Sequence, residues 1–334
     1  MGDLAPAVDR GATLTASIPE RSVPRRDRRC VARMRPLLGT LVEIRAGGAA
    51  ARVARGIAAA FAAIERVQRL MSFHEAGSDV SRINSTPVGR DVAVNRETYG
   101  VLRYALDLGH RSSGAFDITI APSLVSAGFL PCPPLGGLLP ERADDAIHSA
   151  RFSDLELLPD CAVRWRKKGW IDLGGIAKGY AVDVAVAALR SHGITHGLVN
   201  AGGDLRGFGN RPWPIRIRAP EQPETLFDVG SLCDAAIATS AGYLGGRRVG
   251  SRVVDPIVDP GSGNCVAWNA SVSVVASHCM AADALTKVVR LAPAALPALL
   301  EHYDAQAVLA NDLGVRSCGR NRLQGNPPRI RRVR

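Results

Sequence analysis

The chain has 334 residues, 46% of them hydrophobic and 22% charged, which is the balance of a globular protein with a sizeable core. No apolar run approaches about 18 residues, so we expect no stable membrane span. The net charge of +11 lies at the two ends, because residues 1–35 hold eight Arg and four acids, and residues 316–334 hold seven Arg and no acid. Residues 36–315 are close to neutral, which argues against a nucleic-acid partner, since such proteins carry a basic patch on the folded domain.

The two basic ends are expected to be solvated arms on either side of one domain. We expect residues 1–30 and 316–334 to be disordered and residues 31–315 to fold, and a weak polyanion-binding role for the arms stays open. No apolar stretch typical of a secretory signal follows the first arginines, so we expect a cytoplasmic protein. A periplasmic or membrane-associated protein is the alternative if the start codon is misassigned. The seven cysteines form no C-x-x-C pair, which favours reduced, mostly buried thiols.

The N-terminal part is predicted to contain a strand and two helices. LGTLVEIRA (38–46) has the pattern of a strand. Residues 50–72 form an amphipathic helix if their apolar side chains share one face, and Asn95 can cap a second helix over 96–111. The polar segment 72–85 is predicted to be a loop that contains a capped helical turn. The apolar residues of the first helix are spaced by three and four: Ile57, Phe61, Ile64, Val67 and Met71.

The C-terminal part alternates short strands with helices. GWIDLGG (169–175) is predicted to be a strand, and residues 176–193 a helix that stops at Gly193. Residues 195–209 are predicted to be a strand followed by a Gly-rich turn at 200–209. Further strands are expected at 213–220, 235–243, 266–277 and 305–314, helices at 278–293 and 295–303, and loops or turns at 131–145 and 253–266. Strands in antiparallel-looking meanders, mixed with helices, indicate an α+β fold with mixed or antiparallel sheets.

DLGGIAKGYAVD (172–183) is the segment with the strongest indication of a ligand site. Asp172 comes at the end of the predicted strand, and two glycines allow a tight turn at the N-terminus of the next helix. The free N–H groups of that N-terminus favour an anion. Lys178 lies in the first turn, where it opposes the helix dipole unless a phosphate is bound nearby. The alternative is an ordinary strand-turn-helix with a solvated lysine, and the spacing of a P-loop is absent.

Three other segments carry acids in possible site positions. Asp204 follows Gly202 and Gly203 in a turn that could pack beside the first one, although Gly-Gly-Asp is common in plain turns. Asp283 and Lys287 are spaced i,i+4 on one helix face, where they either pair with each other or belong to a site. Asp259 in DPGSG binds a ligand or caps its turn. The histidines lack zinc-ligand spacing.

Seven segments in chain order resemble the ApbE family, the FAD:protein FMN transferases. They are MSFHEAGSDVSRIN, GAFDIT, DLGGIAKGYAVD, NAGGDL, ATSAGY, IVDPGSG and MAADALTK. The resemblance runs from near residue 38 to about residue 314. It implies an ApbE-like α+β fold with a ligand cleft between two subdomains. It also implies transfer of FMN from FAD, beside Mg²⁺, to a Thr or Ser hydroxyl of a target flavoprotein, with release of AMP.

The resemblance further implies roles for individual residues. Those matching the family's flavin and FAD contacts are Leu38, His74, Ala115, Phe116, Asp117, Asp172, Lys178 and Ile257. The carbonyl of Gly175 and the carboxylate of Asp283 would hold the metal, and Lys287 stands where the family often has a threonine ligand. Asp283, Lys287 and Asp259 are the expected catalytic residues.

Two positions depart from the family's pattern. Pro256 stands where the family commonly has a His, and Lys287 replaces the threonine. A charged lysine cannot ligate a metal. Either Lys287 replaces part of the metal's charge, or Thr286 becomes the ligand although it lies about 100° away around the helix.

The resemblance leads to three hypotheses about the activity. The first is FMN transfer to a protein. The second is an FAD pyrophosphatase, in which water is the nucleophile and the products are FMN and AMP. The third is a flavin-binding protein without catalysis, which the two departures favour. The products distinguish the three hypotheses, and the sequence does not name the acceptor protein.

Overall fold

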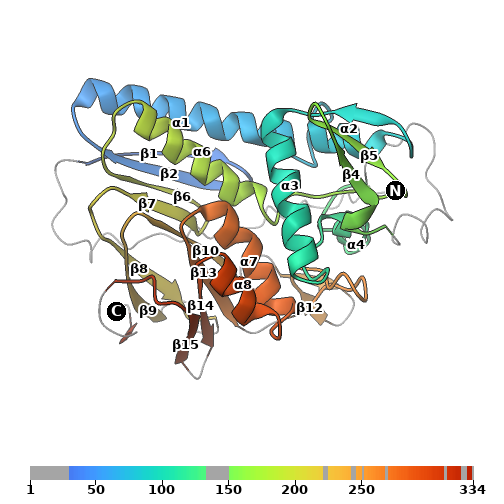
Figure 1. Ribbon diagram of the computed structural model, residues 1–334. Coiled ribbons are helices and arrows are strands. Elements are labelled where there is room, and N and C mark those ends of the chain that lie inside the picture. The colour runs from blue at the N-terminus through green and yellow to red at the C-terminus, as the bar shows by residue number, and fades with distance from the viewer. Residues whose placement is uncertain are drawn as a thin grey trace, which may run out of the picture.

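The computed structural model describes residues 30–132, 150–220, 225–241, 246–249, 252–267, 270–311, 314–324 and 329–332 (Figure 1). Nearly all of the predicted N-terminal arm and most of the predicted loop at 131–145 lie outside these residues. Within the described part of the chain, no helix is long and apolar enough to cross a membrane.

The centre of the fold is an eight-stranded sheet in which every neighbouring pair is antiparallel. Its order is β1-β2-β6-β7-β10-β13-β14-β15. The strands are β1 (Cys30–Leu37), β2 (Thr40–Gly47), β6 (Gly197–Ala201), β7 (Asp204–Phe208), β10 (Ala235–Ala241), β13 (Ser271–Ala276), β14 (Gln306–Asn311) and β15 (Gly314–Gly319). The predicted α+β fold is confirmed. The predicted turn at 200–209 is correct only between β6 and β7, because the segment after Gly203 continues as a strand.

Helices cover one face of this sheet (Figure 1). They are α1 (Ala50–Met71), α6 (Ala177–Ser191), α7 (Cys279–Leu291) and α8 (Leu296–His302). The predicted stripe of α1 is buried from Ile57 to Met71, because residues spaced by three and four share one helix face. α6 packs between α1 and α7. The bounds of α7 and α8 confirm the predicted helices at 278–293 and 295–303.

A small sheet lies on the opposite side, with the order β16-β9-β8. Its strands are β8 (Trp213–Arg218), β9 (Thr225–Leu232) and β16 (Arg329–Arg332). Ile217 and Phe227 of this sheet share a core with Val275 of β13 and Val308 of β14. All six residues of β13 are buried, as expected for a strand covered on both faces.

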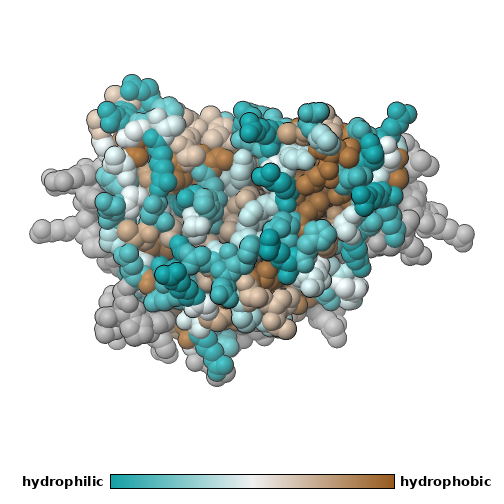
Figure 2. All heavy atoms as spheres, viewed as in Figure 1, coloured by the Kyte–Doolittle hydropathy of each residue, from teal (hydrophilic) through white to brown (hydrophobic). Residues whose placement is uncertain are grey.

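A third group of elements forms the lobe at the right of Figure 1. It contains α2 (Asp79–Ser85), α3 (Arg96–Arg111), α4 (Ala121–Ser126), the short 3₁₀ helices Ile118–Ile120 and Phe152–Asp154, and the sheet β3 (Asp91–Ala93), β5 (Ala162–Trp165), β4 (Leu155–Leu158). Asn95 caps α3 as predicted, and its side chain accepts a hydrogen bond from the N–H of Glu97 at 3.0 Å. In the same view, Figure 2 shows hydrophilic side chains over most of the surface that faces the viewer, and hydrophobic side chains gather mainly on this lobe. A hairpin of β11 (Arg247–Val249) and β12 (Arg252–Val254) completes the described elements.

Residues 169–175 do not form the predicted strand. Their backbone groups find partners that are not a neighbouring strand: the side chain of Asn84 bonds both the N–H and the carbonyl of Ile171, and the N–H of Asp172 donates to the carbonyl of Ile118 at 2.8 Å. The segment is extended and buried, which explains its strand-like pattern. The side chain that replaces a neighbouring strand as the hydrogen-bond partner is that of Asn84, 87 positions before Ile171.

The C-terminal end also differs from the expected disordered arm. Residues Gly314–Gly319 pair with β14, and Arg329–Arg332 pair with β9. Both strands lie at a sheet edge. An edge strand can expose charged side chains while its backbone is paired, as Arg316 does in β15, so the Arg-rich composition did not reveal this strand. The cysteines are free as expected, but only Cys279 is fully buried, and Cys132 and Cys318 are exposed.

Candidate functional site

A cavity of about 830 Å³ lies where the ends of α1, β10 and α7 meet the turn before α6. The volume is typical of a site for a small organic ligand. All eight residues predicted to bind the cofactor line this cavity: Leu38, His74, Ala115, Phe116, Asp117, Asp172, Lys178 and Ile257. Gly175, Lys287 and Pro256 line it as well. The structure therefore brings together segments that are more than 200 residues apart in the sequence.

Leu38 reaches the cavity from the turn between β1 and β2. It has a φ of 56°, a left-handed conformation that is costly for a residue with a side chain. Its N–H donates to Oε1 of Gln68 on α1 at 2.8 Å, which holds the turn against the helix. Gln68 also lines the cavity, and it was not among the predicted site residues.

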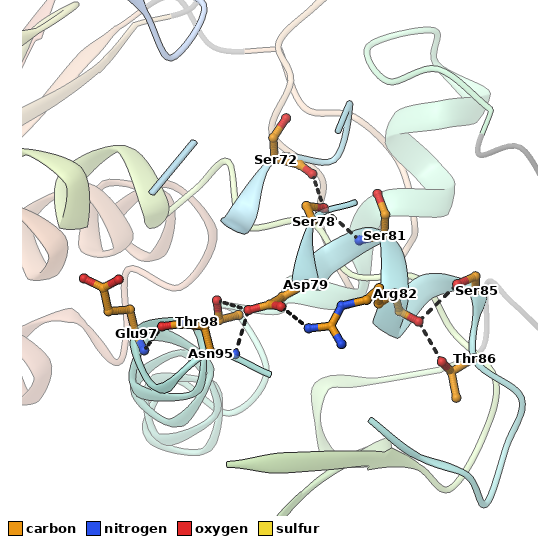
Figure 3. Close-up of polar contacts among 10 residues, drawn as sticks. All are labelled: Ser72, Ser78, Asp79, Ser81, Arg82, Ser85, Thr86, Asn95, Glu97 and Thr98. Carbon is orange, nitrogen blue, oxygen red and sulfur yellow. Dashed lines mark hydrogen bonds and ion pairs between the residues drawn. The ribbon is translucent and has the colours of Figure 1, made fainter. Parts of the chain in front are cut away.

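His74 lies in a short loop that is fixed by serine side chains. The hydroxyl of Ser72 accepts from the N–H of His74 at 3.1 Å, and the hydroxyl of Ser78 donates to the carbonyl of Ser72 at 2.7 Å. Ser78 also accepts from the N–H of Ser81 at 3.0 Å, so it caps α2, as the predicted helical turn requires (Figure 3).

Asp79, at the start of α2, fixes the same loop through contacts with α3. Its buried carboxylate accepts from the N–H of Asn95 at 2.9 Å and from the hydroxyl of Thr98 at 2.6 Å, and it forms an ion pair with Arg82 (Figure 3). These contacts join α2 to α3. The motif SDVSRIN therefore acts as the scaffold that places His74 at the cavity.

The carboxylate of Asp117 has mainly a structural role in this structure. Oδ1 accepts from both the N–H and the hydroxyl of Thr119 at 2.7 Å, and Oδ2 accepts from the N–H of Phe152 at 3.3 Å. Burial raises the pKa of Asp117, although these hydrogen bonds oppose the change. The residue lines the cavity while its charge is directed toward the backbone.

Asp172 lies at the turn before α6. Its Oδ2 accepts from the N–H of Gly174 at 3.0 Å, and burial raises its pKa above the ordinary value. The turn leads directly into α6, whose second residue is Lys178, as the sequence predicts. An acid and a lysine thus enter the cavity from one short segment.

Four charged side chains, two lining the cavity floor and two directly behind it, form what we call the Lys-Asp cluster: Lys178, Asp204, Asp283 and Lys287. Lys178 forms an ion pair with Asp204 on β7, so the two glycine turns do pack together. Asp283 forms an ion pair with Lys287, as their i,i+4 spacing suggests, and its Oδ2 accepts from the N–H of Gly179 at 3.0 Å.

The pKa values of the Lys-Asp cluster reflect burial and mutual attraction. Burial alone would lower the pKa of Lys178, but the carboxylates of Asp204 and Asp283 raise it above the ordinary value. Burial would raise the pKa of Asp283, but Lys287 and Lys178 hold it below the ordinary value. Burial and the nearby charge of Asp283 raise the pKa of Asp204. The raised pKa keeps Lys178 charged at neutral pH.

Gly179 allows α6 and α7 to come close enough to build this cluster. A Cβ at position 179 would lie 2.3 Å from the carbonyl oxygen of Cys279 and 2.8 Å from the Cβ of Asp283. Any other residue would push the helices apart. Asp183, one turn later, accepts from the N–H groups of Cys279 and Met280, both at 2.9 Å, which joins α6 to the start of α7.

The residues expected to hold Mg²⁺ do not fit a divalent cation. The two carboxylate oxygens of Asp283 are taken by Gly179 and Lys287, and its carbonyl accepts from Lys287 at 3.0 Å and from the Thr286 hydroxyl at 2.7 Å. Lys287 offers only donors. Of the expected ligands, only the neutral carbonyl of Gly175 is left. Among the described residues, no group of three or more His, Cys, Asp or Glu could hold a metal ion.

Two expected catalytic residues are not at the cavity surface. Asp283 is 1% exposed and lies behind Lys287. Asp259 is not among the residues that line the cavity, and its carboxylate accepts from the N–H of Gly261 at 3.0 Å and the hydroxyl of Ser262 at 2.8 Å. In this arrangement Asp259 caps its own turn, which was the alternative that the sequence left open.

Arg290 and Asp255 are cavity residues that the sequence reasoning missed. They form a buried ion pair, and Asp255 directly precedes Pro256. The spacing of α7 could have revealed Arg290, because it follows Asp283 by seven residues and Lys287 by three. These intervals place all three residues on one helix face.

The cavity floor presents two ammonium groups beside a helix N-terminus, and its volume suits a large organic ligand. These features define an α+β protein with a site for a large anionic ligand. A family model described as "ApbE family" matches residues 38–309. The chain belongs to the ApbE family.

Named relatives agree with this assignment. The FAD:protein FMN transferase of Vibrio cholerae is 31% identical over 234 residues, which cover 66% of this chain and 69% of that protein. The FAD:protein FMN transferase of Salmonella typhimurium is 26% identical over 64% of each chain, so the alignment spans just under two thirds of that relative. The crystal structure of the ApbE protein of Thermotoga maritima superposes with a TM-score of 0.73 at 26% identity, covering 86% of this chain and 96% of that one.

Proposed function

We propose that this chain transfers FMN from FAD to a Thr or Ser hydroxyl of a target flavoprotein and releases AMP. One observation carries the proposal: the eight residues that the family resemblance assigns to FAD all line a single cavity, although they come from distant segments. The names of the relatives support the same activity. Residues 31–315 would carry the reaction.

The reaction exchanges one bond to phosphorus for another. The acceptor oxygen forms a bond to the phosphorus of the FMN half, and the bond from this phosphorus to the bridging oxygen breaks. AMP leaves with the bridging oxygen and its electron pair, and the hydroxyl proton is released to water. The diphosphate carries two negative charges that repel an oxygen nucleophile, so fixed positive charge at the cavity floor lowers the barrier.

Lys178 and Lys287 would supply that positive charge. Both line the cavity, and each is held by a buried carboxylate that fixes its position before the ligand arrives. Preorganised charges in a site with little water stabilise the charge that develops on the leaving group. His74, Phe116 and Ile257 would border the flavin.

A second cavity beside the first offers a place for the acceptor segment. Its volume is about 780 Å³, and it shares Ile120, Val258 and Pro260 with the first cavity. Exposed Ser126 lines only the second cavity. We expect Ser126→Trp to reduce FMN transfer while FAD binding stays unchanged. Equal losses of both would contradict this placement.

The direct test uses the purified full chain, FAD and a tagged acceptor with a flavinylation-type Thr, in EDTA and in MgCl₂. In-gel flavin fluorescence reports transfer to the acceptor, and chromatography reports AMP. A fluorescent band together with AMP is the expected result, and an acceptor with Ala in place of Thr is the control. AMP and free FMN without a band would show a pyrophosphatase. Bound FAD without products would show a flavin-binding protein.

A further inference from the structure

The charges of the Lys-Asp cluster are arranged in two layers. Lys178 and Lys287 line the cavity, whereas Asp204 and Asp283 lie behind them, each 1% exposed. The chain has 42 Lys and Arg but only four Lys, and two of the four are here. The cluster is neutral as a whole, but the layer that a ligand would touch is cationic, which suits an anion.

Lys287 is held in place by three contacts. Its ammonium forms an ion pair with Oδ1 of Asp283 and donates to the carbonyl of Asp283 at 3.0 Å. Its alkyl chain lies over Gly175, where a Cβ would be 3.5 Å from Cε of Lys287. An ammonium has three donors, and within the described part of the chain two of them go to Asp283. The third remains for an oxygen atom in the cavity.

This position coincides with the one expected for a divalent cation. Asp283 and Gly175 are the two residues that the family resemblance assigns to magnesium, and Lys287 pairs with the first while its alkyl chain lies beside the second. A cation could bind there only after the ammonium had moved away, because two positive charges at contact distance repel each other.

We propose that the ammonium of Lys287 replaces the divalent cation and, together with Lys178, binds the diphosphate of FAD directly, so that FAD binding needs no magnesium. The inference rests on the proposed function, since it takes FAD as the ligand. A lysine ammonium suits the role because it is a compact point charge, unlike the planar guanidinium of arginine. Its place on α7 is fixed by Asp283, as a bound ion would be.

The test measures the dissociation constant of FAD from flavin fluorescence quenching, in EDTA and in MgCl₂. For the wild-type chain we expect the two values to agree within about twofold. Lys287→Met should weaken binding by about tenfold or more in both buffers. Lys287→Thr should bind weakly in EDTA and about tenfold more tightly in MgCl₂, because removal of the ammonium frees Oδ1 of Asp283 for a metal. Lys167→Met, at an exposed lysine, is the matched control and should behave as wild type.

The two buffers separate failure of this inference from failure of the proposed function. Wild-type protein that binds FAD only in MgCl₂ would overturn the inference and leave the function standing. Wild-type affinity of Lys287→Met in EDTA would do the same. If the wild-type chain binds FAD in neither buffer, the proposed function itself fails. Circular dichroism checks that the variants fold, and the gain of Lys287→Thr in MgCl₂ cannot come from unfolded protein.

Discussion

The side chain of Asn84 takes the place of a neighbouring strand for Ile171. Its Nδ2 donates to the carbonyl of Ile171 at 2.9 Å, and its Oδ1 accepts from the N–H of Ile171 at 2.8 Å. Asn84 is 3% exposed and Ile171 is fully buried, so water cannot replace these bonds. One side chain on α2 therefore fixes the backbone that leads to Asp172 and the cavity.

Asn84→Ala should destabilise the fold strongly. It leaves one buried N–H and one buried carbonyl without partners, at about 1–3 kcal/mol each, so we expect a loss of about 2–6 kcal/mol. Urea unfolding followed by circular dichroism measures the change. Asn264→Ala, at an exposed position, is the control and should stay within about 0.5 kcal/mol of wild type. A similarly small effect of Asn84→Ala would show that the two bonds do not hold this segment.

Gly179→Ala should disturb both the fold and the Lys-Asp cluster. The added methyl group would meet the carbonyl of Cys279 at 2.3 Å, so α6 and α7 must separate, at a cost of about 1–3 kcal/mol. Gly100→Ala is the matched control, because it lies within α3 and has no atom within 4 Å of the new Cβ. It should stabilise the protein by about 0.5–1 kcal/mol. Thermal unfolding of both variants tests the contrast, and equal melting temperatures would contradict it.

Asp172→Asn should stabilise the protein at neutral pH. Burial raises the pKa of Asp172 in the folded state, so the folded chain binds this proton more tightly than the unfolded chain does. The ionised carboxylate therefore lowers stability above its folded-state pKa. This cost disappears as the pH falls below the unfolded value of about 3.9. We expect a higher melting temperature for the variant at pH 7.5 and a smaller difference near pH 4. A difference that does not change with pH would exclude this explanation.

Substitutions at Asp259 can separate a turn cap from a catalytic carboxylate. Asn keeps one oxygen that can accept from the N–H of Gly261, and its NH2 group can donate to the hydroxyl of Ser262, whereas Ala can do neither. If Asp259 only shapes the turn, Asp259→Asn should retain FMN transfer within about threefold of wild type. Asp259→Ala should lose about tenfold, equal to about 1.4 kcal/mol of barrier. Loss of activity in both variants would restore the catalytic role.

Much of the helical part of the fold could be predicted from the sequence. The buried stripe of α1 and the Asn95 cap of α3 are local signals, because a repeat of three and four residues or a capping side chain acts within a few turns. The extended segment at 169–175 could not be classified in this way. Its apolar pattern is that of a buried strand. The difference is that its backbone bonds the distant side chain of Asn84 and not a neighbouring strand, and the local sequence cannot reveal that partner.

The site was predictable as a set of segments but not as a set of contacts. Each motif alone was ambiguous, and only their order along the chain pointed to one cavity. Spacing did indicate the pairing of Asp283 with Lys287, because both lie on α7. It could not show that Lys178 pairs with Asp204, or that Asp255 pairs with Arg290, because those partners come from separate elements.

The backbone contact between α6 and α7 at Gly179 has a consequence for how quickly a ligand is captured. One lysine of the cavity belongs to each helix, and the two helices pack so closely at Gly179 that a Cβ there would meet the backbone of α7. In the function proposed above, the two lysines that would bind the diphosphate are therefore in place before the ligand arrives, and no closing step has to precede binding. The association rate of FAD should then follow long-range attraction and fall as ionic strength rises.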